Sequence, residues 1–158
     1  MIIYEEEHAQ LTDICDRLAH DALAKAIFVV DKDGQLVTAT GETAGIDTTG
    51  LASLVAGSTA ATGGLALMLG EEEFPVHFHE GERTHVHISV IEAEIILVVI
   101  FDERSSLGLV RLRVKRTYND MKQVLLSVRK KMGEESKKLD IFGEITDDDI
   151  NNLFNDTF

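Results

Sequence analysis

Four histidines occur within eleven residues, as two pairs in which one residue separates the partners: His77 with His79, and His85 with His87. Residues i and i+2 of an extended strand share one face, so antiparallel pairing of the two segments would bring the four imidazoles together. Imidazole nitrogens are common zinc ligands. This is the one pattern in the sequence that could form a metal site.

A hairpin whose polar face carries histidine explains the same pattern without a metal. The residues of its buried face would then be Val76, Phe78, Val86 and Ile88. A functional metal site also needs carboxylates that orient the imidazole rings, and Glu80 and Glu82 fall in the predicted loop instead. We therefore expect no metal and no cofactor. A histidine cluster would then act mainly by charging together below about pH 6.5.

Other reactive residue types do not form a catalytic motif. The sequence contains no P-loop, dinucleotide-binding glycine motif, nucleophile elbow or paired-cysteine zinc motif. Cys15 lies on the apolar side of a predicted helix, where a thiol is usually a small core residue. Arginines 104, 111, 113 and 116 could supply an arginine finger to a nucleotide, but a solvated helix face is the simpler interpretation. We expect no active site in this chain.

Length, charge and cysteine content restrict the class of protein. A chain of 158 residues predicts one domain with a sizeable core. Its formal net charge of −13 argues against nucleic acid and anionic membranes as partners and favours a basic groove on another protein. The longest apolar run, Ile95–Phe101, is too short to span a bilayer. With one cysteine and no recognisable leader, a cytoplasmic location is expected.

The residues from Asp47 to Gly70 predict the helix around which the chain is organised. Asp47 is a good N-cap, and large apolar residues recur at helical spacing to form a face for the core: Leu51, Leu54, Val55, Leu65 and Leu69. A second row has very small side chains: Ala52, Ala56, Ala60 and Gly64. Such a row lets another backbone approach closely, either the protein's own sheet or a partner. Glycines inside the helix weaken it and call for such a contact.

The remaining patterns predict helices on both sides of a sheet. Tyr4–Ala22 and the segment from Ser105 onward have helical periodicity, although Leu109 to Lys115 also alternates like a strand. The predicted strands are Ala26–Val30 and Gln35–Thr40, joined by a two-residue turn at Asp33-Gly34, then Val76–His79, Thr84–Ile91 and Ile95–Phe101. The last of these is apolar on both faces, which is typical of a central strand. The fold class is α/β (α+β), with a five-stranded, mainly antiparallel sheet between helices.

The C-terminal part of the sequence predicts a tail. Residues 133–143 are polar and are interpreted as a mobile linker. A short amphipathic helix then begins with Thr146 as N-cap and Ile145 with Ile150 as a hydrophobic staple. Its apolar side consists of Ile150, Leu153 and Phe154. So short a helix is expected to fold on docking. The predicted division is residues 1–132 as the domain and 133–158 as an acidic linker with this helix.

The chain resembles the roadblock/dynein-light-chain family. The order of elements matches, as do these segments: Cys15-Asp16-Arg17-Leu18, Val30–Leu36, Ile46–Thr49, Leu51–Leu54, Gly63–Ala66, Phe78–Gly81, Leu97–Asp102, Ser106–Arg113, Asp147–Ile150 and Asn152–Phe154. The resemblance covers almost the whole chain. Two departures are that Gly50 stands where a serine is expected and that His77, His85 and His87 are not part of the family pattern.

The resemblance implies a roadblock/longin-like homodimer that activates a bacterial Ras-like small GTPase of the MglA type, in cell polarity and motility, with concentration at a cell pole. Family members remodel the switch region of the GTPase without supplying an arginine finger. The implied GTPase-binding positions are Ala52, Ala56, Ala60, Ala61, Gly64 and Met68. The terminal helix, through Ile150, Leu153 and Phe154, would dock in a remote groove of the GTPase and promote nucleotide exchange. The alternative is a non-catalytic homodimeric adaptor of light-chain type.

Overall fold

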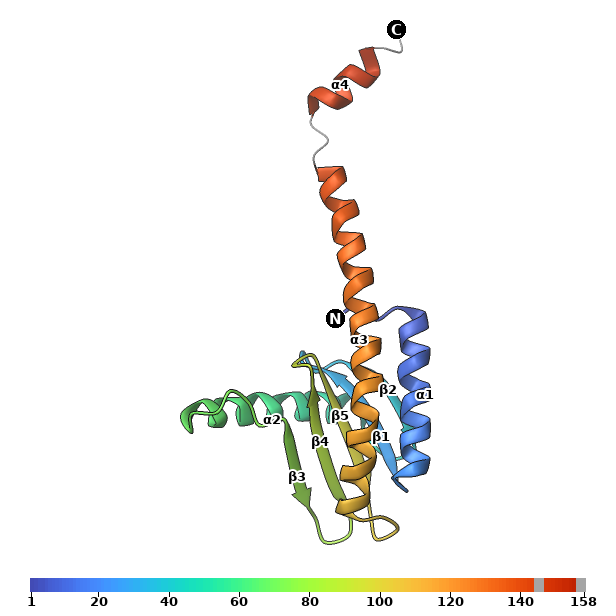
Figure 1. The fold of residues 1–158 in the computed structure, drawn as a ribbon, viewed down its shortest axis with the longest axis vertical. Helices are drawn as coiled ribbons and strands as arrows, with labels where there is room; N and C mark the ends of the chain where they lie inside the picture. The colour runs from blue at the N-terminus through green and yellow to red at the C-terminus, as the bar shows by residue number, and fades with distance from the viewer. Residues whose placement is uncertain (144–146, 156–158) are drawn as a thin grey trace.

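The computed structural model describes residues 1–143 and 147–155 (Figure 1). The elements follow the predicted order. They are α1 (Glu5–Asp21), β1 (Ala26–Asp31), β2 (Leu36–Gly41), α2 (Thr48–Met68), β3 (Val76–Glu80), β4 (His85–Ile91), β5 (Ile95–Phe101), α3 (Leu107–Gly143) and α4 (Asp147–Asn155). The strand alternative for Leu109–Lys115 is wrong, because these residues are helical. The hydroxyl of Ser106 accepts a hydrogen bond from the backbone of Leu109 and stabilises the start of that helix.

The five strands form one antiparallel sheet in the order β2-β1-β5-β4-β3, which confirms the predicted sheet. Helices α1 and α3 cover one face, and α2 crosses the other face (Figure 1). The sheet therefore separates two layers of core. Strand β3 lies at an edge, and Pro75 precedes it, so the missing N–H of proline costs little there.

Strand β5 occupies the centre of the sheet, and all its residues are buried, as its two apolar faces predicted. Ile95, Leu97, Val99 and Phe101 belong to the core beneath α1 and α3. Ile96, Val98 and Ile100 belong to the core beneath α2. Because strand residues alternate between faces, one apolar strand holds both layers together.

The hairpin between β1 and β2 is confirmed, but its predicted two-residue turn is wrong. Asp31 donates its backbone N–H to the carbonyl of Gln35, which leaves residues 32–34 as the loop. The Asp31 carboxylate accepts backbone hydrogen bonds from Asp33 and Gln35, and Gly34 has φ +91°. A three-residue loop with glycine in the left-handed region is a common hairpin connection. Asp-Gly therefore marked the turn correctly but not its length.

The predicted linker at 133–143 is also wrong, because α3 runs without interruption to Gly143. Charged side chains of opposite sign recur four residues apart here, as in Lys130 with Glu134 and Glu134 with Lys138. Such pairs stabilise an exposed helix by about 0.2–0.5 kcal/mol each. They offset the cost of about 1 kcal/mol for Gly133 inside the helix. The polar composition therefore reflects a solvated helix rather than a loop.

A buried carboxylate connects α1 to α3. The Glu7 side chain is almost completely buried, and its Oε1 lies 2.7 Å from Nζ of Lys131, which also contacts Glu6. The hydrogen bond from Lys131 holds the pKa of Glu7 below its usual value. This pair therefore stabilises the fold above the ordinary pKa of glutamate, and its contribution is lost as the pH falls through the lowered pKa.

Lys131→Met should lower the urea concentration at the unfolding midpoint, because it leaves the Glu7 carboxylate buried without its cation. Lys130→Met, one residue earlier at an exposed position, provides the control. The expected difference between the two variants is large at pH 7 and shrinks toward pH 3. Equal midpoints for both variants at pH 7 would contradict this role of Lys131.

Candidate docking surface

Helix α2 begins as predicted, with the Asp47 carboxylate accepting a hydrogen bond of 3.0 Å from the backbone of Gly50. Its contact with the sheet is made by small residues: Ala52 and Val55 are buried in the core, and Ala56 packs against it. The prediction that Leu54, Leu65 and Leu69 face the core is therefore wrong. A helix that crosses a sheet closely favours small side chains at the crossing, and of the leucines predicted for the core only Leu51 packs against it.

The C-terminal half of α2 projects past the edge strand β3 (Figure 1). Large apolar side chains are exposed on this half of the helix. Met68 is 85 % exposed and Leu67 is 71 % exposed, and Leu54, Leu65 and Leu69 are also exposed. We call Leu65, Leu67, Met68 and Leu69 the overhang. No charged residue occurs between Thr48 and Met68. So much contiguous apolar surface is typical of a protein interaction site.

The predicted docking positions differ in accessibility. Ala60, Ala61, Gly64 and Met68 are exposed, and Ala56 is half-buried. Ala52 is fully buried between α2 and the sheet and has no surface left for a partner, which corrects its place among the predicted contacts. Apart from its chain neighbours and the backbone of its own helix, a Cβ atom added at Gly63 or Gly64 would meet no atom of the described chain within 4 Å. The chain's own packing therefore does not require glycine at either position.

Hollows flank α2 on both sides. One, of about 210 Å³, lies between Ala56, Thr59 and Ala60 and the turn from β4 to β5. The other, of about 510 Å³, lies between the N-terminal half of α2 and the uncovered face of β3 and β4. The second is apolar, with Leu51, Leu54, Val86, Ile88 and Ile100 in its lining. The exposed side of α2 therefore forms a ridge with a groove on each side.

Among the described helices, α2 alone has the length and hydropathy compatible with a membrane span, with a mean hydropathy of 1.4. However, Ala52 and Val55 of the same helix belong to the core of the domain. Its remaining apolar surface is more simply explained as an interface with protein. Periodicity alone places Leu54, Leu65 and Leu69 in the core, but all three are exposed.

The four histidines do not come together, because the observed register does not bring the two pairs onto one face. In the register of β3 with β4, His77 lies opposite Ile88 and His79 opposite Val86, whereas His87 lies opposite Phe78. His77 and His79 therefore face α2, whereas His85 and His87 face α3. Within residues 1–143 and 147–155, no group of three or more potential metal ligands occurs. The predicted apolar face is wrong for the same reason, because Phe78 and Val86 lie on opposite faces.

His87 is buried on the α3 side of the sheet. Burial, together with the nearby positive charge of Arg111, lowers its pKa below the ordinary value for histidine. Its protonation therefore favours the unfolded chain, and stability is lost as the pH falls through about 6.5, the pKa of unfolded histidine.

His87→Gln should reduce the loss of stability between pH 7 and pH 5, because glutamine cannot be protonated there. Urea unfolding at both pH values measures the change. His20→Gln is the control, since His20 is exposed on α1. A pH dependence that is the same for both variants would contradict the inference.

Neither Cys15 nor Arg104 is available for chemistry. Cys15 is buried in the core, as predicted, and burial raises the pKa of its thiol to about 12. The Arg104 guanidinium forms paired hydrogen bonds of 3.1 Å with the Glu42 carboxylate and also binds Asp102. Arginines 111, 113 and 116 lie on α3, on the opposite side of the sheet from α2. The solvated-face interpretation fits these positions better than an arginine finger.

The short C-terminal helix is present as α4, which carries Ile150, Leu153 and Phe154. Leu153 is exposed, and Figure 1 places α4 beyond the end of α3, apart from the sheet. The predicted cap and staple residues Thr146 and Ile145 lie outside the described residues. The position of α4 is compatible with a docking element that is separate from the domain.

Comparison with known proteins assigns the fold to a family. The family model of the Roadblock/LC7 domain matches residues 11–101, so the chain belongs to the Roadblock/LC7 family. Within that family it is similar to MglB of Myxococcus xanthus, with 50 % identity and a TM-score of 0.76 over 80 % of this chain and 96 % of that one. A gliding protein MglB from Thermus thermophilus matches at 27 % identity, with a TM-score of 0.73 over 78 % and 94 % of the two chains.

A further MglB structure, described as having a tetrameric arrangement, matches at 26 % identity, with a TM-score of 0.73 over 78 % of this chain and 93 % of that one. The comparison with curated proteins found no match. The chain is therefore an MglB-like roadblock protein, as the motifs around the hairpin and α2 predicted.

Proposed function

We propose that this protein is a homodimeric regulator of a Ras-like small GTPase of the MglA type and that it accelerates GTP hydrolysis. Similarity to MglB over most of the chain supports this proposal. The observation that carries it is the exposed, uncharged surface of α2, which combines an apolar overhang with small residues at Ala60, Ala61 and Gly64. The regulator provides the platform, and the GTPase performs the chemistry.

The proposed dimer rests on surfaces that complement each other. The overhang of α2 is apolar, and so is the groove between the N-terminal half of α2 and strands β3 and β4. A two-fold axis can place each overhang near the groove of the other protomer. Strand β3 also has an unpaired edge in the single chain, which can join the edge of a second copy. Both contacts would be repeated by symmetry.

The proposed activation works by selecting one switch conformation of the GTPase. The protein can shift that equilibrium only by its differential affinity, so binding to the GDP form must be weaker. The ridge of α2 carries no arginine or lysine, and Arg104 is held by Glu42 and Asp102. These positions support a mechanism in which the GTPase's own residues complete its active site and this chain supplies no arginine finger.

Phosphate release tests this function. An MglA-type GTPase loaded with GTP is mixed with the full chain, and the initial rate is compared with that of the GTPase alone. A faster rate that saturates with protein concentration supports activation. Binding without any change in rate would instead support the adaptor, a dimer that joins proteins without changing the nucleotide state. If the chain binds neither the GTP form nor the GDP form of the GTPase, the activator and the adaptor proposals are both overturned.

The C-terminal helix is proposed to dock in a groove on the same GTPase. Removal of the residues after Gly143 should leave the free energy of unfolding of the domain unchanged, because the last buried side chain described on α3 is that of Val128. We expect the truncated chain to bind GTPase more weakly or to lose stimulation of nucleotide exchange. Fluorescent nucleotide release measures exchange. Identical binding and exchange in both chains would contradict this role of α4.

We also propose a cytoplasmic location with concentration at a cell pole. A fluorescent fusion of the full chain tests it, and uniform fluorescence would contradict the polar part of the proposal.

A further inference from the structure

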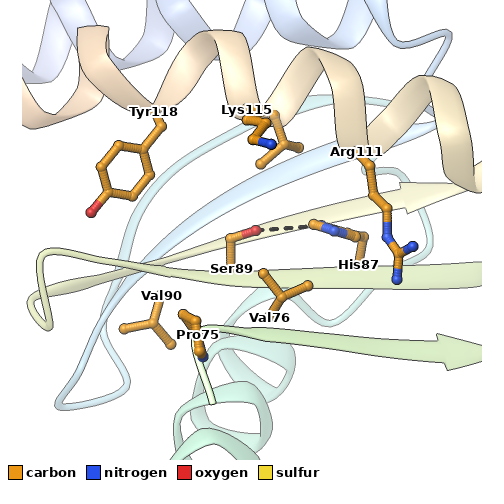
Figure 2. Close-up of a pocket in the computed structure, with 9 residues that line it drawn as sticks. Pro75, Val76, His87, Ser89, Val90, Arg111, Lys115 and Tyr118 are labelled. Atoms are coloured by element: carbon orange, nitrogen blue, oxygen red, sulfur yellow. Dashed lines mark hydrogen bonds between the residues drawn. The ribbon is translucent and has the colours of Figure 1, made fainter. Parts of the chain in front are cut away.

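A cavity of about 590 Å³ lies on the other side of the sheet from α2, between α3 and the strands β3 and β4 (Figure 2). Val76 and Pro75 line it from the sheet edge, and Val114 and Tyr118 line it from α3. Its volume falls within the range of small-molecule sites, about 300–1,000 Å³. The sheet separates this cavity from the proposed GTPase surface on α2, so the inference that follows does not depend on GTPase binding.

The floor of the cavity is polar where a core is expected. His87 and Ser89 are both buried on β4 and lie opposite the apolar residues Val99 and Leu97 of β5. Nδ1 of His87 is 3.4 Å from Oγ of Ser89 (Figure 2). Buried polar groups cost stability unless they are satisfied. Here the two side chains partner each other, and together they give the cavity a polar floor.

The α3 side of the cavity carries two positive charges that are not neutralised. Arg111 and Lys115 are one helical turn apart, and both belong to the lining. None of the nine lining residues is acidic, although the sequence has 28 acidic residues and only 15 lysines and arginines. Among the described residues neither cation forms an ion pair, whereas Arg104, Lys122, Arg129 and Lys131 all do.

We propose that this cavity binds an aliphatic monocarboxylate, with its carboxylate at Arg111 and Lys115 and its hydrocarbon chain along Val76 and Val114. Guanidinium and ammonium groups on adjacent turns fit a carboxylate through charge-assisted hydrogen bonds. The mostly apolar walls fit an unbranched chain. Tyr118 closes the far end, where its hydroxyl donates a hydrogen bond of 3.0 Å to Glu92.

Dodecanoate below its micelle concentration is a suitable probe, and the absence of tryptophan from the sequence provides the readout. Tyr118→Trp places a single fluorophore in the cavity wall. Leu126→Trp is the matched control, because Leu126 is 40 % exposed on α3 and Tyr118 is 37 % exposed. We expect saturable quenching or a spectral shift in the Tyr118 variant only. Chemical-shift changes in the unsubstituted chain should cluster at β4 and the first turns of α3.

The proposed contact of the ligand carboxylate with Arg111 and Lys115 is tested by the double variant Arg111→Gln, Lys115→Gln. This variant should bind dodecanoate at least roughly tenfold more weakly, which corresponds to the loss of one charge-assisted hydrogen bond. Its affinity for dodecan-1-ol should be unchanged, because the alcohol has the same chain and no charge. Circular dichroism checks that the variants fold, and the chemical-shift experiment needs no substitution.

Three results would overturn the proposal. These are equal responses of the two tryptophan variants, equal affinity of the double glutamine variant for dodecanoate, and binding only to phosphatidylglycerol vesicles and not to free dodecanoate. A change in oligomeric state on dodecanoate addition, with no saturable signal at Tyr118→Trp, would also overturn it and assign the groove to a second copy. Phosphate release by the GTPase enters none of these measurements, so the two proposals can fail separately.

Discussion

Gly64→Arg is expected to abolish the stimulation of GTP hydrolysis while the protomer remains folded. The added side chain has open space within its own chain, because a Cβ at Gly64 meets no atom within 4 Å beyond its neighbours and the backbone of its own helix. It also replaces glycine inside a helix, which should raise helix stability by up to about 1 kcal/mol. Loss of activity could therefore not be attributed to unfolding. The arginine would instead stand in the proposed contact with the GTPase.

Gly133→Arg is the matched control for this experiment. Gly133 is also an exposed helical glycine with open space around its Cβ position, but it lies on α3. Phosphate release should remain at the unsubstituted level in this control. Ala60→Arg should reproduce the effect of Gly64→Arg, because Ala60 is exposed one turn earlier on α2. Full stimulation by both α2 variants would remove α2 from the proposed contact.

Leu67→Asp combined with Leu69→Asp is expected to convert the protein from a dimer to a monomer. Both leucines belong to the overhang, and the proposed interface buries them against a second copy. A carboxylate buried without a partner costs several kcal/mol, so two of them at each symmetric contact should weaken association by at least about a hundredfold. Sedimentation equilibrium over a range of concentrations measures this change.

A control with the same exposure exists elsewhere in the chain. Leu67 and Leu69 are 71 % and 65 % exposed, and Leu139 and Ile141 on α3 have the same two values. Leu139→Asp combined with Ile141→Asp should therefore add the same charge without changing the association constant. If the control pair dissociates the dimer and the overhang pair does not, the interface lies on α3. If the unsubstituted chain sediments as a monomer, the proposed dimer is wrong.

The sequence identified the elements but not how their faces meet. Strand β5 was predictable because an apolar run with no polar alternation can only be buried on both sides. The positions of the four histidines were not predictable, because the register of β3 with β4 decides whether their side chains share one face of the sheet. A shift of one residue separates the two pairs onto opposite faces. Turn signals and composition do not determine that register.

Helix α2 shows a second limit of periodicity. Periodicity predicts its leucines in the core, because apolar residues at helical spacing usually face inward. Close approach to the sheet instead favours Ala52 and Ala56 on the inner side, beside Leu51 and Val55, and leaves Leu54, Leu65 and Leu69 exposed. Each row therefore lies partly in the core and partly on the surface. A helix that is apolar all round signals two interfaces, and sequence alone does not say which serves the core.

The length of α3 sets where the terminal helix can act. From Val128, its last buried residue among those described, α3 continues for fifteen residues to Gly143, or about 22 Å at the usual rise per residue. If α4 docks on a partner as proposed, a partner bound to the domain reaches α4 only by extending past this part of α3.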